Sequence, residues 1–303
     1  MKIAIVVCEN RFEQTVISIK SAIIFTNKTL LFVVFADEQN KRKLTHFITE
    51  IPNNLMKRIM FEIHLISFPN SKWKSLFKTC ASQRLFLPTL LNQTDSVIYV
   101  DNDVLFLTSV EKLWNFFTEM SESQIAAMTP EQEDYSIGWY NRFAKHPYVE
   151  PLGVNSGVML MNLTRMRNIE WASYLPSILD KYDSEIVWGD QDIINIYFHS
   201  HKDQLLVIPC EWNFRPDHCI YSEVCKTAKV GGAQLLHGNR DSFINDKLPV
   251  FKIIFNAIKE YEFNSEIRAN LLLPLIKQLQ IMQHTSCGKS YATIIKSLTS
   301  MYL

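Results

Sequence analysis

Short apolar runs alternate with stretches of helical spacing through the first hundred residues of this 303-residue chain. The runs that predict strands are Ile3–Val7, Leu30–Phe35, Phe61–Ser67 and Val97–Val100. Between the first two, Glu13–Phe25 places its apolar residues at the spacing of an amphipathic helix. Strands that alternate with helices form mostly parallel sheets with helices on both faces. This rhythm therefore predicts an α/β fold with a Rossmann-like sheet.

The second half of the chain is less regular, and it contains no internal repeat or low-complexity linker. We therefore expect one continuous domain over residues 1–263. Its expected strands are Gln124–Met128, Val158–Met161, Leu205–Pro209 and Ala233–His237, and its expected helices are Asp190–Phe198 and Pro249–Tyr261. After Phe263, apolar residues recur at helical spacing; they are Ile267, Leu271, Leu272, Leu275, Ile276, Leu279 and Met282. This predicts a helical tail of unknown role, residues 264–303, that packs on the domain or, alternatively, meets a membrane.

Charge and cysteine usage narrow the functional class. The chain has 31 basic and 31 acidic residues, so no nucleic-acid partner is expected. It lacks both an apolar run long enough to span a membrane and a signal peptide, so a targeting segment would lie upstream. Six cysteines and three glycosylation sequons favour an oxidising compartment. Cys219 and Cys225 are close enough in sequence to close a small disulfide, whereas Cys8 is expected to be a buried strand thiol.

Two carboxylates, Asp101 and Asp103, interrupt the apolar run Val97–Leu107 where the expected strand ends. Open α/β sheets bind ligands beyond the carboxyl ends of their strands. Carboxylates at positions i and i+2, with Asn102 between them, can offer hard oxygen ligands to one divalent cation, and such a cation would neutralise a diphosphate. The alternative for so short a motif is a solvated Asp-Asn turn between two strands.

A second segment, Leu235–Arg240, brings a histidine, a glycine and a cation to the end of another expected strand. Neutral imidazole is a good ligand for manganese-like metals, so His237 is a candidate ligand, and the alternative is a hydrogen-bonded core histidine. Gly238 would let the backbone approach a phosphate closely. Arg240 and Lys247 could hold a diphosphate by charge-assisted hydrogen bonds.

Three further polar positions are candidates for the same site. Asp190 and its neighbours open an expected helix, where they serve either as capping residues or as active-site groups. Asn155 lies in a glycine-bounded turn and could hydrogen-bond a sugar hydroxyl or simply close the turn. Arg84 would approach a nucleotide sugar if its helix faces the site, and would otherwise be an exposed helical arginine. Aromatic clusters that suit either a sugar face or an ordinary core are Trp139–Phe143 and Trp212–His218.

An acidic pair after a strand also resembles phosphatases that use an aspartyl nucleophile. In those enzymes the pair lies on the first strand and a threonine or valine follows two positions after the second aspartate. Here the pair begins at Asp101 and Leu105 follows, and His237 would have no role. The chain also lacks a glycine-rich phosphate loop and a G-x-S-x-G elbow. We therefore disfavour the phosphatase hypothesis.

Taken together, these residues resemble glycosyltransferase family 8, a group of retaining enzymes with the GT-A fold that bind a nucleotide sugar through a divalent metal, usually manganese. Within the family, the resemblance is closest to the glucoside xylosyltransferases and runs from about Ile3 to about Phe263. The segments that carry it are Phe77–Pro88, Ile137–Ala144, Gly153–Asn162 and Trp212–Tyr221. The tail after Asn264 matches no part of the family pattern.

The resemblance implies transfer of xylose from UDP-xylose, in α-1,3 linkage, to O-linked glucose on epidermal-growth-factor-like (EGF-like) repeats such as those of Notch. Alternatives are a family 8 transferase that uses UDP-glucose or UDP-galactose, and a catalytically silent nucleotide-sugar binder. The implied location is the lumen of the endoplasmic reticulum or Golgi. The family's type II membrane anchor is absent from this sequence, so we expect a truncated form.

The resemblance also implies a role for individual residues. The implied metal ligands are Asp101, Asp103 and His237. The implied catalytic residues, which line the donor-sugar and acceptor pocket, are Asn155, Asp190 and Gln191. The residues expected to bind the nucleotide are Val7, Cys8, Glu9, Arg84, Asn102, Gly238, Arg240 and Lys247, together with the two metal-binding aspartates. Retention of configuration allows double displacement, with Asp190 or Asp192 as nucleophile. We favour front-face attack, in which the leaving phosphate takes the acceptor proton.

Overall fold

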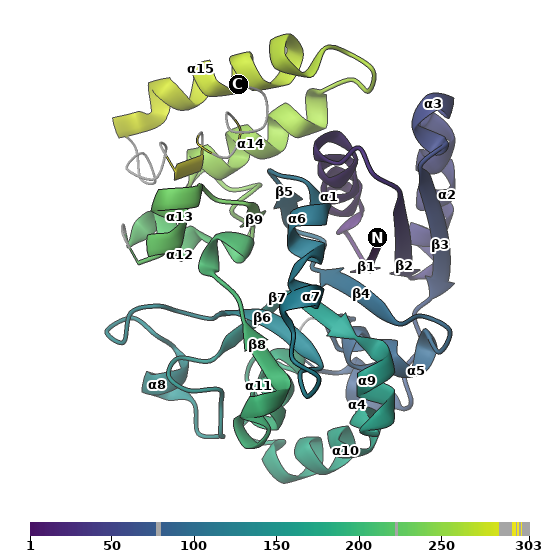
Figure 1. Cartoon of the computed structure of the whole chain (residues 1–303), viewed down its shortest axis with the longest axis vertical. Helices are drawn as coiled ribbons and strands as arrows, with labels where there is room; N and C mark the ends of the chain where they lie inside the picture. The colour runs from purple at the N-terminus through teal and green to yellow at the C-terminus, as the bar shows by residue number, and fades with distance from the viewer. Residues whose placement is uncertain (77–79, 222–223, 285–292, 295, 297, 299–303) are drawn as a thin grey trace.

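The computed structural model describes residues 1–76, 80–221, 224–284, 293–294, 296 and 298. A seven-stranded sheet in the order β3-β2-β1-β4-β7-β6-β8 forms its centre, and a two-stranded sheet, β5-β9, lies beside it (Figure 1). The strands are β1 (Lys2–Val7), β2 (Leu30–Ala36), β3 (Ile59–Leu65), β4 (Ser96–Val100), β5 (Val104–Phe106), β6 (Ala126–Pro130), β7 (Val154–Asn162), β8 (Leu205–Val207) and β9 (Leu235–His237).

Helices cover both faces of the large sheet. The α-helices are α1 (Phe12–Phe25), α2 (Glu38–Glu50), α3 (Asn53–Met56), α4 (Ser71–Lys74), α5 (Leu87–Leu90), α6 (Val110–Trp114), α7 (Phe116–Glu119), α8 (Tyr140–Phe143), α9 (Leu163–Asn168), α10 (Trp171–Tyr182), α11 (Asp190–Ser200), α12 (Pro216–Ile220), α13 (Lys226–Gly231), α14 (Pro249–Glu260) and α15 (Leu273–Ile281). The 3-10 helices are η1 (Ala81–Phe86), η2 (Lys202–Gln204), η3 (Cys210–Asn213) and η5 (Met282–His284), and a π-helical turn, η4 (Arg268–Leu272), precedes α15.

The amino-terminal half of the sheet is parallel, as the strand–helix rhythm predicts. β1 pairs in parallel with both β2 and β4, and β2 pairs in parallel with β3. The third strand begins at Ile59, two residues before its expected start, because Ile59 is buried opposite Leu30. β7 then runs antiparallel to β4 and β6, so the sheet is mixed but mostly parallel. The expected Rossmann-like α/β fold is confirmed.

The core fills both faces of this sheet because alternate residues of each strand point to opposite sides. Val6 and Tyr99 pack on one face with Trp171 of α10 and residues of α11. Ile5 and its neighbours pack on the other face with Ile19 of α1 and residues of α2. The sheet is therefore packed on both faces where β1 and β4 end and where the antiparallel strand β7 begins, and this edge carries the candidate site.

The expected apolar run Val97–Leu107 divides into two strands. β4 ends at Val100, and Asp101, Asn102 and Asp103 form the connection to β5. β5 leaves the large sheet and pairs antiparallel with β9, which places Val104 opposite His237. This pairing brings the acidic motif and the histidine together although more than 130 residues separate them in sequence.

The carboxyl-terminal helices lie together at one end of the molecule, shown in yellow-green in Figure 1. Leu271, Leu275 and Leu279 are buried against the same cluster as Phe251 of α14, so the expected packing of the tail on the body is confirmed for α15. Most of residues 285–303 lie outside the described residues, and the division after residue 263 stays a prediction. In the described part of the chain, no helix combines the length and apolar character needed to cross a membrane.

Candidate active site

Asp101, Asp103 and His237 meet because β5 pairs with β9. The Gly238 backbone N–H donates to the Asp103 carbonyl at 2.6 Å, next to the Val104–His237 pair, and this bond extends the pairing of the two strands. His237 Nε2 lies 3.4 Å from Asp103 Oδ1 and 3.8 Å from Asp101 Oδ2. One possible ligand atom from each of the three side chains lies within 4.8 Å of the others. Two carboxylates and an imidazole suit a manganese-like divalent cation, so the residues fit such a metal.

A chain of hydrogen bonds sets the orientation of His237. Its Nδ1 lies 2.9 Å from Asn213 Oδ1, and the Asn213 amide nitrogen donates to Asn155 Oδ1 at 2.7 Å. The Asn155 amide nitrogen donates in turn to Glu131 at 2.6 Å. With both amides oriented in this way, Nδ1 of His237 carries the proton and donates it to Asn213. Nε2 therefore faces Asp101 and Asp103 and is the ring nitrogen positioned to bind a metal.

The neighbouring strand leaves room for the imidazole through a glycine. Gly157 of β7 accepts a hydrogen bond from the Asp101 backbone N–H at 2.8 Å. A Cβ atom at Gly157 would lie 2.2 Å from His237 Cε1 and 2.5 Å from His237 Nδ1. The imidazole can therefore occupy its position only because residue 157 has no side chain.

Arg84 lies at the centre of a buried charge cluster rather than on an exposed helix. Its side chain, only 3% exposed, lies in η1 and stacks over the Tyr99 ring, with the guanidinium carbon 4.3 Å from the ring centroid. One terminal nitrogen lies 2.9 Å from Asp101 Oδ1, and Nε contacts Asp190. The other terminal nitrogen donates to the Ser156 carbonyl. Arg84 thus joins a candidate metal ligand to the first residue of α11.

The buried cation and the buried carboxyl influence each other's protonation. Burial by itself would lower the pKa of Arg84, but Asp101 and Asp190 hold it above its ordinary value, so the guanidinium stays charged. Burial raises the pKa of Asp190 to about 6, although Arg84 opposes the rise. Asp190 therefore changes charge in the range just below neutral pH.

This shift predicts a pH dependence of stability in the metal-free protein. A carboxyl with a higher pKa in the folded state binds its proton more tightly there, so its stabilising contribution is complete below about pH 4 and is lost as the pH rises through about 6. We expect the free energy of unfolding of the wild type, relative to Asp190→Asn, to fall by about 1 to 3 kcal/mol between pH 4 and pH 7.5. Urea unfolding of both proteins across this range measures the difference. Parallel pH profiles would contradict the shift.

A cavity of about 290 Å³ opens beside the metal-ligand cluster. The expected site residues that line it are Arg84, Asp101, Asn155, Asp190, Gln191, His237 and Arg240. Three aromatic side chains, Trp139, Tyr140 and Trp188, form another part of its lining, with the Trp139 and Trp188 ring centroids 5.6 Å apart. The structure therefore brings together residues from η1, β7, α11 and β9, with Asp101 from the connection after β4, around one space that aromatic rings partly enclose.

Asp192 supports this aromatic lining but does not itself line the cavity. Its carboxylate accepts the backbone N–H groups of Val187 and Trp188, both at 2.7 Å, and the Tyr140 hydroxyl at 2.8 Å. The side chain is fully buried, with His146 Nε2 at 3.4 Å. Of the two carboxylates that the sequence offers as nucleophiles, only Asp190 reaches the cavity.

Two functional residues, Glu131 and Asn213, are missing from the sequence-based set. Glu131 lines the cavity, and its Oε2 accepts from Asn155 at 2.6 Å and from Gln191 Nε2 at 3.3 Å. Asn213 holds the tautomer of His237. The sequence signal was position: Glu131 lies three residues after the expected strand Gln124–Met128, and Asn213 lies in the aromatic segment Trp212–His218, which suits either a sugar face or a core.

Three of the residues expected to bind the nucleotide, Val7, Cys8 and Glu9, lie at the end of β1 or directly after it. Cys8, Glu9 and Asn102 line a cavity of about 140 Å³ that shares Arg84 and Asp101 with the first one. A larger cavity, about 680 Å³, adjoins it and is also lined by Cys8 and Glu9. Val7 is fully buried in the strand and lines none of the three.

The expectation that Cys8 is a free thiol is wrong. Cys8 forms a disulfide with Cys80, and the bond ties the end of β1 to the residue that precedes η1. Because η1 carries Arg84, this cross-link connects the two walls of the smaller cavity. The sequence could not reveal the partner, since the two cysteines lie 72 positions apart.

Of the two basic residues expected to hold a diphosphate, Arg240 lies at the cavity and Lys247 does not. Arg240 lines the cavity and makes two hydrogen bonds to Asp217, at 3.0 and 3.2 Å. Lys247 is exposed and lines none of the cavities described above. A Cβ atom at Gly238 would lie 2.2 Å from the Phe243 ring, so this glycine permits close packing of the following turn.

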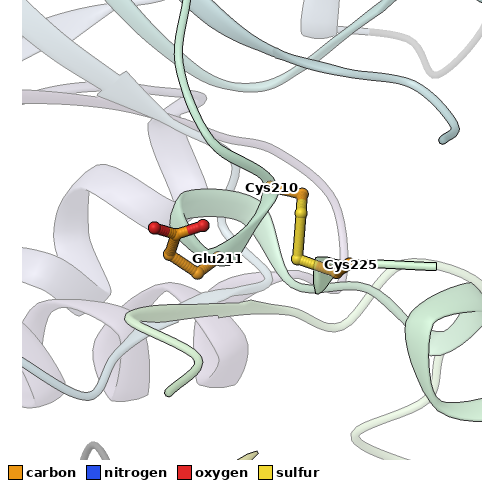
Figure 2. A group of neighbouring side chains, drawn as sticks. All are labelled: Cys210, Glu211 and Cys225. Atoms are coloured by element: carbon orange, nitrogen blue, oxygen red, sulfur yellow. A yellow bond between two sulfur atoms is a disulfide. The ribbon is translucent and has the colours of Figure 1, made fainter. Parts of the chain in front are cut away.

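A second group of possible metal ligands is not a metal site. Cys210, Glu211 and Cys225 lie together, but Figure 2 shows a disulfide between the two cysteines. Disulfide sulfurs have no thiolate to offer a metal. The pairing also corrects the expected bond between Cys219 and Cys225; Cys219 is itself disulfide-bonded.

Comparison with known proteins gives a consistent result. A model of glycosyl transferase family 8 matches residues 2–239. Glucoside xylosyltransferase 1 of Gallus gallus is 45% identical to this chain, over 98% of this chain and 72% of its own length. The Homo sapiens protein of the same name is also 45% identical, over 98% of this chain and 70% of its own length. The crystal structure of mouse xyloside xylosyltransferase 1 covers 81% of this chain and all of its own, with a TM-score of 0.60 and 20% identity. Galactosyltransferase LgtC, solved with donor and acceptor sugar analogues, covers 89% of this chain and all of its own, with a TM-score of 0.65 and 18% identity; both likenesses concern the GT-A fold.

Proposed function

The chain belongs to glycosyltransferase family 8, and we propose on that basis that it transfers xylose from UDP-xylose to O-linked glucose on EGF-like repeats of the Notch type. The new bond is α-1,3 and configuration is retained. The observation that carries the proposal is the cluster of Asp101, Asp103 and His237 beside a cavity lined by Arg84 and Asp190. The relatives that match nearly the whole chain are named glucoside xylosyltransferases, which supports xylose as the sugar and a glucoside as the acceptor.

The three clustered side chains would hold a divalent metal, and we take manganese as the cation. When bound, such a metal supplies Lewis-acid stabilisation of the leaving diphosphate. The oxygen and nitrogen donors of Asp101, Asp103 and His237 suit this cation, and the hydrogen bond from His237 Nδ1 to Asn213 directs Nε2 toward the two carboxylates. Arg240, at the cavity edge, adds positive charge near the same position.

The contacts of the carboxylates favour front-face attack over double displacement. A nucleophilic carboxylate must approach the anomeric carbon to about 3 Å with a free lone pair. Asp192 is fully buried and held by two backbone N–H groups, and Asp190 is paired with Arg84. The chain's residues then position the donor and acceptor, with Asn155 and Gln191 on the cavity wall, while the leaving phosphate takes the acceptor proton.

The disulfides support the proposed cellular location. The disulfides Cys8–Cys80 and Cys210–Cys225 are bonds that form and persist in oxidising compartments. This supports action in the lumen of the endoplasmic reticulum or Golgi. We propose the type II anchoring of the family as well.

Release of UDP in the presence of manganese tests the proposal. The purified protein is supplied with UDP-xylose, UDP-glucose or UDP-galactose, each with and without a β-glucoside acceptor. Acceptor-dependent release from UDP-xylose alone, with a xylosylated product by mass spectrometry, is the expected result. Release from a hexose donor would keep the transferase and change the donor. Bound manganese and UDP without any turnover would identify a catalytically silent nucleotide-sugar binder.

A further inference from the structure

Three exposed apolar side chains lie on the two segments that supply Trp139 and Trp188 to the cavity lining. Tyr135, Phe143 and Val187 are 63%, 55% and 50% exposed, although each has a large hydrophobic side chain. We call these three residues the rim patch. They come from two separate segments: Tyr135 and Phe143 flank the residues that place Trp139 at the cavity, and Val187 directly precedes Trp188.

The rim patch is continuous with the cavity lining. The Phe143 ring centroid lies 6.5 Å from that of Trp139, and Trp139 lies 5.6 Å from Trp188. The Tyr135 carbonyl accepts the Asn141 side-chain amide at 2.9 Å, which holds both ends of the first segment together. Phe143 and Val187 therefore lie next to residues that line the cavity.

The rim patch is also held in place by hydrogen bonds. The Val187 backbone N–H donates to Asp192 Oδ2, and the same carboxylate binds Trp188 and Tyr140. Asp192 therefore fixes both segments relative to one another. A pre-organised surface loses little conformational entropy when it binds a partner.

We infer that the rim patch is the docking surface for the polypeptide part of a folded glycoprotein acceptor, whose glucose enters the cavity. The inference rests on the proposed function. It further specifies where the acceptor protein binds and by which kind of contact. A glucose that is covalently attached to a folded domain carries that domain to the cavity opening, and the groups it meets there are aromatic and aliphatic.

Charge indicates the kind of contact. An acid, Asp134, directly precedes Tyr135, and a base, Arg142, directly precedes Phe143. The Arg142 guanidinium carbon lies 4.7 Å from the Phe143 ring centroid. Charges of both signs beside the rim patch give it no strong field of either sign. We therefore expect the acceptor surface near the glucose to present exposed apolar side chains, and we expect binding that depends little on salt.

A variant with Tyr135→Ser, Phe143→Ser and Val187→Ser tests this inference. Two acceptors are compared with UDP-xylose: a folded EGF-like repeat that carries O-linked glucose, and methyl β-glucoside, which has no polypeptide. We expect kcat/KM for the repeat to fall at least tenfold, mainly through KM, and kcat/KM for the small glucoside to change less than twofold. The matched control is Met60→Ser with Ile281→Ser, residues that are 50% and 68% exposed on β3 and α15, away from the cavity, and it should leave both values unchanged (Figure 1).

Binding separates this inference from the proposed function. Surface plasmon resonance measures binding of the same glucosylated repeat, with UDP and manganese present, and needs no turnover. If methyl β-glucoside is not xylosylated by the wild type, the proposed reaction fails, yet weaker binding of the repeat to the variant still supports docking. Equal binding by wild type and variant, or equal losses with both acceptors, overturns the docking surface. When the disulfides of the repeat are reduced, we expect the wild-type kcat/KM for the repeat to fall about tenfold as well. Full activity on the reduced repeat would overturn recognition of a folded domain.

Discussion

Replacing Asp103 by alanine is expected to lower kcat/KM for xylosyl transfer by about a thousandfold or more. The substitution removes one of three candidate metal ligands, and Lewis-acid stabilisation of a leaving diphosphate is worth several kcal/mol. A loss of about 4 kcal/mol of transition-state stabilisation corresponds to roughly a thousandfold in rate. Steady-state kinetics with UDP-xylose and a β-glucoside at saturating manganese measures the loss.

The structure offers a direct control for this prediction. Asp180 is an aspartate whose side chain is 74% exposed and pairs with Lys72, away from the cavity linings. Asp180→Ala should keep kcat/KM within twofold of the wild type. Manganese titration by electron paramagnetic resonance should show weaker binding to Asp103→Ala and unchanged binding to Asp180→Ala. Wild-type activity in the Asp103 variant would remove this residue from the metal site.

Local sequence patterns predicted the parts of the fold that depend on local interactions. The parallel strands and helix α1, which begins one residue before its expected start at Glu13, follow from apolar periodicity. The cluster of candidate metal ligands was also readable, because its carboxylates and its histidine each lie at the end of an expected strand. α10 was not predicted, although its buried residues Trp171, Leu175 and Leu179 recur every four positions.

Features that depend on long-range packing were not readable. The disulfide partners Cys8 and Cys80 lie on separate elements, and nothing in either local sequence specifies the other. Glu131 and Asn213 join the site only through a chain of side-chain hydrogen bonds that the folded sheet creates. Whether Arg84 faces the site or the solvent stayed open, because its neighbours in sequence do not show that η1 packs against β4 and α11. Pairing and burial, unlike periodicity, are properties of the whole chain.

Replacing Arg84 by methionine is expected to destabilise the protein by about 3 to 5 kcal/mol at pH 7.5. The substitution removes the cation and leaves the carboxyl of Asp190, 3% exposed, without its partner in a buried site. Because Arg84 holds the pKa of Asp190 down, that pKa should rise further in the variant. Urea unfolding of the metal-free variant and wild type measures the difference.

The partner residue distinguishes a lost charge pair from lost packing. Adding Asp190→Asn to Arg84→Met removes the unpaired charge, so the double variant should regain most of the stability at pH 7.5. The loss in the single variant should also shrink at pH 4, where the Asp190 carboxyl is protonated and neutral. Both variants should lose at least about a hundredfold in kcat, because Arg84 also contacts Asp101 and fixes the cavity wall at Ser156. If the double variant is as unstable as the single one, Arg84 acts through packing on Tyr99, and its role as a counter-ion to Asp190 is wrong.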